Sequence, residues 1–140
     1  MNVLVDSSAV LALLNGRDQW HPAAVAVLEH LVSGKVCFLM TNFLIAETHT
    51  LLLSRLGRDI AREWLLNYDW NIIHITREDE ALAREIIGKY RDKDFSFIDA
   101  TSFIIMQKYN LRLAFTFDQH FKQFGFERLS KNPPGPFTNK

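Results

Sequence analysis

Short apolar runs alternate with segments of helical periodicity along the chain, and this alternation constrains the fold more than any other feature. Strands are predicted at residues 2–6, 36–40, 71–75 and 112–117, with a short edge strand at 127–129. Because helical segments separate the strands, the strands should run parallel in one sheet with helices on both faces. The sequence therefore predicts the α/β class with a mainly parallel central sheet.

Local signals mark the beginnings of several helices. Ser7 or Ser8 is expected to cap the helix that follows the first strand, and Thr76 to cap a later one. Ser96 and Asp99 have the spacing of a capping box, with Asp in place of the more usual Glu. These signals place the helices between the predicted strands, as the α/β interpretation requires.

Length and composition predict a single globular domain. The chain has 140 residues, of which 48% are hydrophobic and 23% are charged, an ordinary balance for a globular protein. We expect the domain to span residues 1–131. The segment 132–140 is rich in Pro and polar residues, and we expect it to be a disordered tail.

Charge and cysteine content restrict the functional class. With 16 basic and 16 acidic residues the formal net charge is zero, which argues against a uniformly basic nucleic-acid coat. The single cysteine, Cys37, lies in an apolar run and suits a reducing cytoplasm. We expect no membrane span and no signal peptide, because no apolar stretch is long enough and no basic residue precedes the first one. The sequence thus predicts a cytoplasmic location.

Four acidic residues occur where apolar segments begin or end. Asp6 and Asp118 follow predicted strands, whereas Glu47 and Asp99 lie near the starts of apolar helices. Carboxyl ends of parallel strands meet at one edge of a sheet, and right-handed crossovers start the next helices at that edge. The four acids can therefore converge, and a hard divalent cation would relieve their mutual repulsion. The pattern indicates a Mg²⁺ or Mn²⁺ site, and crowding should raise the pKa of at least one carboxyl.

Helix capping is the competing explanation. For Asp99 or Asp118 taken alone, a cap is the favoured interpretation, because Asp is common at helix N-termini. Asp6 and Glu47 are harder to explain in this way. Ser7 is available to cap the helix after Asp6, and Glu47 lies about one turn inside its helix.

Four short segments resemble the PIN-domain ribonucleases of the VapC-like toxin type. They are Val5-Asp6-Ser7-Ser8-Ala9, Ala46-Glu47, Asp94-Phe95-Ser96-Phe97-Ile98-Asp99-Ala100 and Thr116-Phe117-Asp118. The resemblance covers nearly the whole chain, with the segments in the family's order. It implies a three-layer α/β/α sandwich and Mg²⁺- or Mn²⁺-dependent endonucleolytic cleavage of RNA. It also implies an antitoxin protein as partner and a homodimer.

The resemblance assigns roles to particular residues. The catalytic and metal-binding set corresponds to Asp6, Glu47, Asp99 and Asp118. Asp94 is an additional acid that could also bind the metal. Thr116 and Ser7 are expected to support this set, and Thr116 matches a hydroxyl residue that often precedes the last acid of the family. Phosphodiester hydrolysis fits these residues, because carboxylates hold divalent ions that activate water and neutralise phosphate charge.

Other polar residues near the acids receive weaker assignments. His49 and His120 lie close in sequence to Glu47 and Asp118, but ordinary surface or core roles are favoured for both. Lys93 and Lys122 are candidates for steering phosphate.

Two further groups of residues are interpreted as parts of the fold. Arg55, Arg58 and Arg62 recur at helical spacing and are interpreted as a solvated face with local ion pairs rather than an RNA or antitoxin contact. Five aromatic residues are expected to build the core rather than to stack on bases: Phe95, Phe97, Phe103, Phe115 and Phe117.

Two other functions remain open at this point. One is a catalytically inactive PIN-like module that serves as an interaction scaffold, against which the intact acid set argues. The other is a metal-dependent DNA nuclease or phosphatase that uses similar carboxylates. Metal binding by the purified protein tests the first alternative, and substrate screening tests the second.

Overall fold

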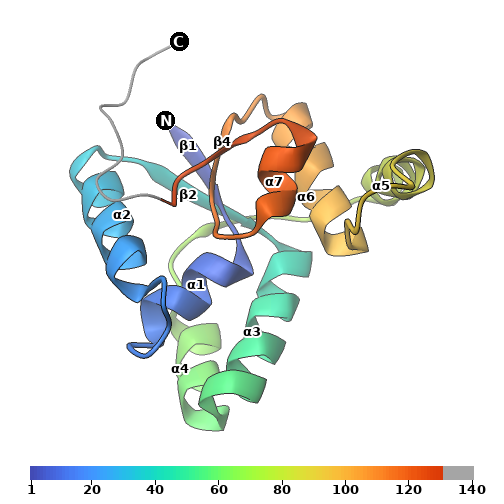
Figure 1. Cartoon of the computed structure of the whole chain (residues 1–140). Helices are drawn as coiled ribbons and strands as arrows, with labels where there is room; N and C mark the ends of the chain where they lie inside the picture. The colour runs from blue at the N-terminus through green and yellow to red at the C-terminus, as the bar shows by residue number, and fades with distance from the viewer. Residues whose placement is uncertain (131–140) are drawn as a thin grey trace.

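A five-stranded parallel sheet forms the centre of the molecule (Figure 1). The computed structural model describes residues 1–130. The strands lie in the order β3-β2-β1-β4-β5. Their bounds are β1 Asn2–Val5, β2 Cys37–Thr41, β3 Asn71–Ile73, β4 Leu113–Phe115 and β5 Glu127–Arg128. The predicted parallel sheet is therefore confirmed.

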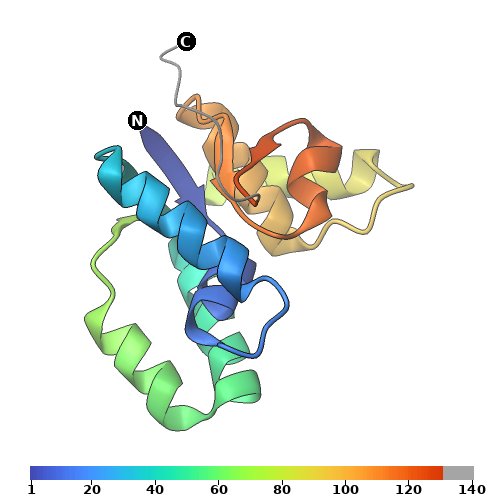
Figure 2. The same ribbon diagram turned by 60° about the vertical axis from the view of Figure 1, so that its left-hand side comes forward.

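Helices cover both faces of this sheet, which makes three layers. They are α1 Ser7–Leu14, α2 His21–Ser33, α3 Asn42–Leu56, α4 Arg58–Asn67, α5 Arg77–Lys89, α6 Phe97–Lys108 and α7 Gln119–Phe124. Figures 1 and 2 show α1–α4 gathered on one side of β1 and α5–α7 on the other. This division follows from the strand order, because the crossovers through β1, β2 and β3 proceed in one direction and those to β4 and β5 in the other.

β1 is the central strand and the most deeply buried. Val3, Leu4 and Val5 are each at most 1% exposed. Leu4 pairs with Leu39 of β2 on one side and with Ala114 of β4 on the other. The strand order reverses at β1, so the carboxyl ends of β1 and β4 form the switch point at which α/β sheets bind ligands.

β1 and β5 are each one residue shorter than the sequence predicts, and two other strands are shorter by more. β3 ends at Ile73 rather than at residue 75, and β4 ends at Phe115 rather than at 117. In both places a side chain replaces the next backbone partner. Ile75 donates its N–H to Asn42 Oδ1 at 2.8 Å, and Phe117 donates its N–H to Ser8 Oγ at 3.0 Å.

The predicted cap of α1 is wrong. Asp6, not Ser7 or Ser8, is the N-cap residue, and its carboxylate accepts the N–H of Ser8 at 3.4 Å. Asp6 has the extended backbone of a cap, with φ −92° and ψ 157°. The other predicted cap signals are confirmed, because capping boxes begin both α5 and α6.

The aromatic core is largely as predicted, with one error. Phe95, Phe103 and Phe115 are buried, and Phe103 stacks on Phe124 with 4.4 Å between ring centroids. Phe117 is half-buried. Phe97 was expected in the core, but 38% of its surface is exposed, because it is the first residue of α6 and lies outside the layer between α6 and the sheet.

Two sequence predictions concern the limits of the chain. The predicted tail, 132–140, lies outside the described residues, so the domain range 1–131 stays a prediction. Among the helices of residues 1–130, none has both the length and the apolar character needed to cross a membrane.

Candidate active site

Asp6 is held at the carboxyl end of β1 by hydroxyl groups from two other segments. Its Oδ2 atom accepts hydrogen bonds from Ser8 Oγ at 2.7 Å and from Thr116 Oγ1 at 2.8 Å. Thr116, which follows β4, also accepts the backbone N–H of Asp118 at 3.0 Å. Asp6 is only 3% exposed. One threonine hydroxyl thus ties the acid after β1 to the acid after β4.

Glu47 is positioned by the beginning of α1. The hydroxyl of Ser7 donates a hydrogen bond to Glu47 Oε1. Because Asp6 is the N-cap, Ser7 is free to make this contact instead of capping the helix. Glu47 lies on the second turn of α3, which begins directly after β2 with Thr41 as its cap. This hydrogen bond therefore joins α1 to α3 near the carboxyl ends of β1 and β2, the strands that precede them.

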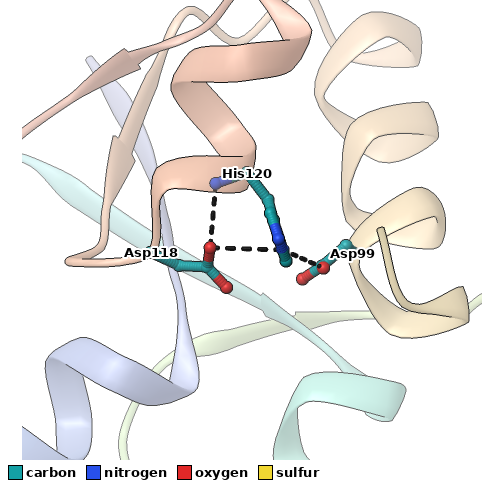
Figure 3. Close-up of side chains that lie close together, drawn as sticks. All are labelled: Asp99, Asp118 and His120. Carbon is teal, nitrogen blue, oxygen red and sulfur yellow. Dashed lines mark hydrogen bonds and ion pairs between the residues drawn. The ribbon is translucent and has the colours of Figure 1, made fainter. Parts of the chain in front are cut away.

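Asp99 and Asp118 are joined by His120 (Figure 3). His120 Nδ1 lies 2.7 Å from Asp99 Oδ2 and 3.3 Å from Asp118 Oδ1. Asp99 is the third residue of α6 and completes the capping box with Ser96, while Asp118 caps α7. Ligand atoms of these three residues lie within 4.8 Å of one another. The capping interpretation of both acids is correct, yet it does not separate them from the other two carboxylates.

The four carboxylates share one geometric property. Each uses a single oxygen for hydrogen bonds to the protein: Asp6 Oδ2, Glu47 Oε1, Asp99 Oδ2 and Asp118 Oδ1. Among residues 1–130, no donor contacts the second oxygen of any of the four. Asp6, Glu47, Asp99 and Asp118, which we call the carboxylate cluster, therefore offer four hard oxygen donors, the ligand type that Mg²⁺ and Mn²⁺ prefer.

Burial and the charges of neighbouring acids disfavour ionisation of two members of the carboxylate cluster, Asp6 and Glu47. Burial raises the pKa of Asp6 to about 6, against the hydrogen bonds from Ser8 and Thr116, and the charges of Glu47 and Asp118 raise it further. Burial also raises the pKa of Glu47, again with contributions from Asp99 and Asp118. The predicted direction is confirmed, but burial rather than crowding is the largest cause. A bound cation would offset both effects.

Asp94 does not join the other acids in this structure. It is exposed in the loop before α6, and within residues 1–130 it has no hydrogen bond or ion pair. Its role as a further metal ligand remains a prediction. Lys93, a candidate for steering phosphate, pairs with Asp92 at 3.2 Å, and Lys122 is exposed on α7.

The remaining polar predictions concern α3, α4 and α7. Arg55, Arg58 and Arg62 are all exposed, as predicted, and Arg58 lies 3.9 Å from Asp59. His49 is half-buried on α3 and has no hydrogen bond to the carboxylate cluster among the described residues. An ordinary surface or core role was favoured for His120; the structure places its ring against two acids of the cluster, and a contact with substrate stays a prediction. The spacing Asp118-x-His120 at a helix start was the available signal, but the contact with Asp99 is 21 residues away in sequence.

Comparison with known proteins identifies the class. The PIN domain matches residues 3–127, and the chain therefore belongs to the PIN-domain family. The predicted VapC-like ribonuclease is also confirmed. The chain is 34% identical over 128 residues to the 23S rRNA-specific endonuclease VapC20 of Mycobacterium tuberculosis, covering 89% of this chain and 95% of VapC20.

A second relative and a solved structure of VapC20 give the same assignment. The VapC ribonuclease of Archaeoglobus fulgidus is 31% identical, with 86% of this chain and 80% of that protein covered. The crystal structure of Mycobacterium tuberculosis VapC20, described as a sarcin–ricin loop cleaving toxin, matches with a TM-score of 0.78 and 31% identity. This match covers 89% of this chain and 96% of the VapC20 chain. The structural match and the sequence matches therefore agree on the fold and the family.

Proposed function

We propose that the carboxylate cluster is the catalytic centre of this ribonuclease, with Asp6, Glu47, Asp99 and Asp118 holding Mg²⁺ or Mn²⁺. The observation that carries this proposal is the free oxygen on each of the four carboxylates. An acid that serves only as a cap or a hydrogen-bond acceptor has no need of three acidic neighbours. The raised pKa values of Asp6 and Glu47 support the same assignment, because they arise from burial and from neighbouring acids, and a bound cation would favour the ionised form of both carboxyls.

The protein's own groups divide the work of RNA hydrolysis. When bound, a divalent ion would supply an activated water and neutralise charge on the phosphodiester. Thr116 and Ser8 fix the orientation of Asp6, and Ser7 fixes that of Glu47. His120 holds Asp99 and Asp118 against one side of its ring, which leaves their second oxygens available. Glu47, whose second oxygen accepts no hydrogen bond from the described residues, is suited to accept a proton from the attacking water.

We propose a structured ribosomal RNA as the substrate. VapC20 is named as a 23S rRNA-specific endonuclease and as a sarcin–ricin loop cleaving toxin. The match to VapC20 spans 89% of this chain and 95% of VapC20, which supports a substrate of the same class. A ribosomal substrate would also place the enzyme in the cytoplasm, in agreement with the single cysteine.

Incubation with total cellular RNA tests activity and substrate together. The purified protein is incubated with Mg²⁺, Mn²⁺ or chelator, and the new RNA ends are sequenced. We expect metal-dependent cuts at one or a few positions in large ribosomal RNA. Cleavage that persists in excess chelator would contradict the metal mechanism. Binding of metal without any cleavage would favour the inactive module, and cleavage of DNA alone would favour a DNA nuclease.

We also propose an antitoxin protein as a partner, which would bind over a long apolar groove. This groove, of about 650 Å³, lies between α1, α2 and α4 and contains none of the four carboxylates. Trp64 and Leu14 line it together with the acids Asp59, Glu63 and Asp69. An amphipathic helix with basic flanks would match both its apolar floor and its acidic rim. Co-purification with the product of a neighbouring reading frame tests this partner.

A homodimer is the expected assembly of the enzyme itself. Large apolar side chains are exposed on several helices, including Val32 at 61% and Leu66 at 73%. Light scattering at tens of micromolar, a practical range for an interface of standard size, should give the mass of two chains. A single-chain mass at that concentration would count against the dimer.

A further inference from the structure

Two pairs of aromatic rings are attached to the segments that carry the catalytic acids, and each pair leaves one ring exposed. Phe97 pairs with Phe43, and Trp20 pairs with Phe117. Phe97 is 38% exposed and Trp20 is 45% exposed. Their partners, Phe43 and Phe117, are half-buried and pack against them. Exposed aromatic rings on rigid supports are the form that proteins use to bind unstacked bases.

The first pair joins the N-terminal ends of α3 and α6. Phe97 is the first residue of α6, two positions before Asp99, and Phe43 is the second residue of α3. Phe43 is four positions before Glu47, so these two side chains lie on the same side of α3. The ring centroids are 5.7 Å apart with an interplanar angle of 62°. This edge contact holds Phe97 against the side of α3 that also carries Glu47.

The second pair lies at the segment that follows β4. Phe117 lies between Thr116, which binds Asp6, and Asp118, which caps α7. Trp20, at the start of α2, stacks on Phe117 with 5.4 Å between centroids and an interplanar angle of 13°. Because one face of the indole covers Phe117, the exposed area of Trp20 belongs to its opposite face and its edge. The indole is thus a flat surface fixed on Phe117, which adjoins Asp118 in the sequence.

We propose that Phe97 and Trp20 are base-stacking residues for single-stranded RNA, one on each side of the scissile phosphate. This inference rests on the proposed function. The carboxylate cluster with its metal would bind the phosphate, which carries no sequence information. The bases on either side must unstack before the phosphate can enter, and a flat ring beside the cluster would compensate for the stacking that they lose.

The surroundings of the two rings favour RNA over a protein partner. Ser96 and Asp94 beside Phe97 are exposed polar residues, as is Gln19 beside Trp20. Each ring is therefore a single exposed aromatic side chain that an exposed polar residue precedes in the sequence. The groove between α1, α2 and α4 differs, because there the apolar side chains are contiguous, as a protein helix would require. Isolated rings fit single bases better than they fit the continuous apolar face of a helix.

Kinetics on a short RNA that carries the mapped cleavage site tests the proposal. Variants Phe97→Ala and Trp20→Ala are compared with Tyr109→Ala, a matched control, since Tyr109 is 49% exposed at the opposite end of α6. Loss of one stacked base should lower kcat/KM by about 5- to 100-fold. Tyr109→Ala should stay within twofold of the wild type. Phe97→Tyr should retain activity, whereas Phe97→Leu, which keeps the packing against Phe43, should not.

Abasic RNA separates stacking from a purely structural role. An abasic nucleotide on one side of the scissile phosphate should reduce wild-type cleavage by the same factor as the variant on that side. It should cause no further loss in that variant. Equal losses of each variant on intact and abasic RNA would overturn the proposal, because the defect would then not involve the base. Cleavage at control levels by both variants, or a defect only in antitoxin binding, would overturn it as well.

Failure of this inference is distinguishable from failure of the proposed function. If the wild type cleaves no RNA in any metal, the proposed function fails and the variants are not needed. If the wild type cleaves but Phe97→Leu and Trp20→Ala match Tyr109→Ala, the stacking proposal alone fails. Thermal melting of each variant shows whether a loss reflects unfolding, and Phe97→Leu remains informative if Phe97→Ala does not fold.

Discussion

Helices α5 and α6 begin with the same local structure and use it for different ends. In each, a hydroxyl residue caps the helix and an Asp three positions later bonds back to the cap: Thr76 with Asp79, and Ser96 with Asp99. The hydrogen-bond distances are nearly equal, 3.0 and 3.1 Å in the first and 3.0 Å for both in the second. Both acids are buried. Local geometry therefore does not distinguish them.

The difference lies in the charges around them. Asp79 has a cation, with Lys108 Nζ at 3.3 Å from Oδ1. Although burial raises the pKa of Asp79, hydrogen bonds from Thr76 and the charge of Lys108 outweigh it and leave the pKa below its usual value. Asp99 instead has His120 on one oxygen and contributes to the repulsion that raises the pKa of Glu47. The Asp of a capping box that pairs with a cation has a structural role, whereas the Asp of a capping box that lies among other acids is a candidate metal ligand.

The largest expected effect is on activity. Asp99→Asn keeps the cap, because Ser96 is the N-cap and an Asn amide oxygen can still accept the backbone N–H of Ser96, but it removes a ligand charge. We expect RNA cleavage to fall by at least about 100-fold. Asp79→Asn is the matched control and should cleave within about twofold of the wild type, since it makes no contact with the carboxylate cluster. Equal losses in the two variants, measured as kcat/KM on the mapped RNA, would break the comparison.

Much of this architecture was predictable from the sequence. Apolar runs located the strands, and parallel topology placed the acids that follow them at one edge. Ser96 and Asp99 were recognisable as a capping box from their spacing alone. The sequence could not show which charged or titratable side chain lies next to the Asp of each capping box. Lys108 lies 29 residues from Asp79, and His120 lies 21 residues from Asp99, so both contacts depend on how α5, α6 and α7 pack.

The cap of α1 was mispredicted for a related reason. Ser7, Ser8 and Asp6 are all good N-cap residues, and local preference does not choose among them. The choice is made by distant partners: Glu47 takes the hydroxyl of Ser7, and Thr116 with Ser8 binds the carboxylate of Asp6. The prediction that Phe97 is buried was wrong for a similar reason. Its spacing in the sequence is that of a core residue, but Phe97 lies at the outer end of α6.

The second prediction uses the pH dependence of stability, for which Asp6 and Asp79 should behave oppositely. The pKa of Asp6 is raised from 3.8 to about 6, so the folded state binds the extra proton. In chelator, the contribution of Asp6 is fully present below about pH 4 and is lost as the pH rises through about 6. Asp6→Asn lacks this loss and should be more stable than the wild type above pH 6, by up to about 3 kcal/mol.

Denaturant unfolding at several pH values between 4 and 8 measures this difference. The gap between Asp6→Asn and the wild type should be near zero at pH 4 and should grow toward neutral pH. Asp79→Asn should show a gap of the opposite sign. A constant gap across the range would mean that the effect of Asp6→Asn is packing rather than charge.

The third prediction concerns metal. A saturating ion stabilises the folded protein by mass action, by about 2.7 kcal/mol at a concentration 100 times its Kd. Mn²⁺ should therefore raise the Tm of the wild type and of Asp79→Asn equally, and that of Asp99→Asn much less. Calorimetric titration with Mn²⁺ checks the same point without heating. An unchanged Mn²⁺ response in Asp99→Asn would show that Asp99 is a structural cap and not a ligand.

The smallest effect is expected for the ion pair of Asp79. Asp79→Asn removes a charge that interacts with Lys108 and with the N-terminus of α5, which should cost about 1 kcal/mol at neutral pH. The side chain of Lys108 is 46% exposed, so solvent weakens its part of this effect. Because the pKa of Asp79 is lowered, the stabilisation is present above the unfolded pKa and is lost as the pH falls through the folded value.

A double-mutant cycle with Lys108→Gln isolates the pair, and the coupling should vanish in acid. If the coupling is zero at neutral pH while Asp79→Asn remains destabilising, the hydrogen bonds of the cap, and not the cation, hold this carboxylate, and the contrast with Asp99 rests on the acids around Asp99 alone.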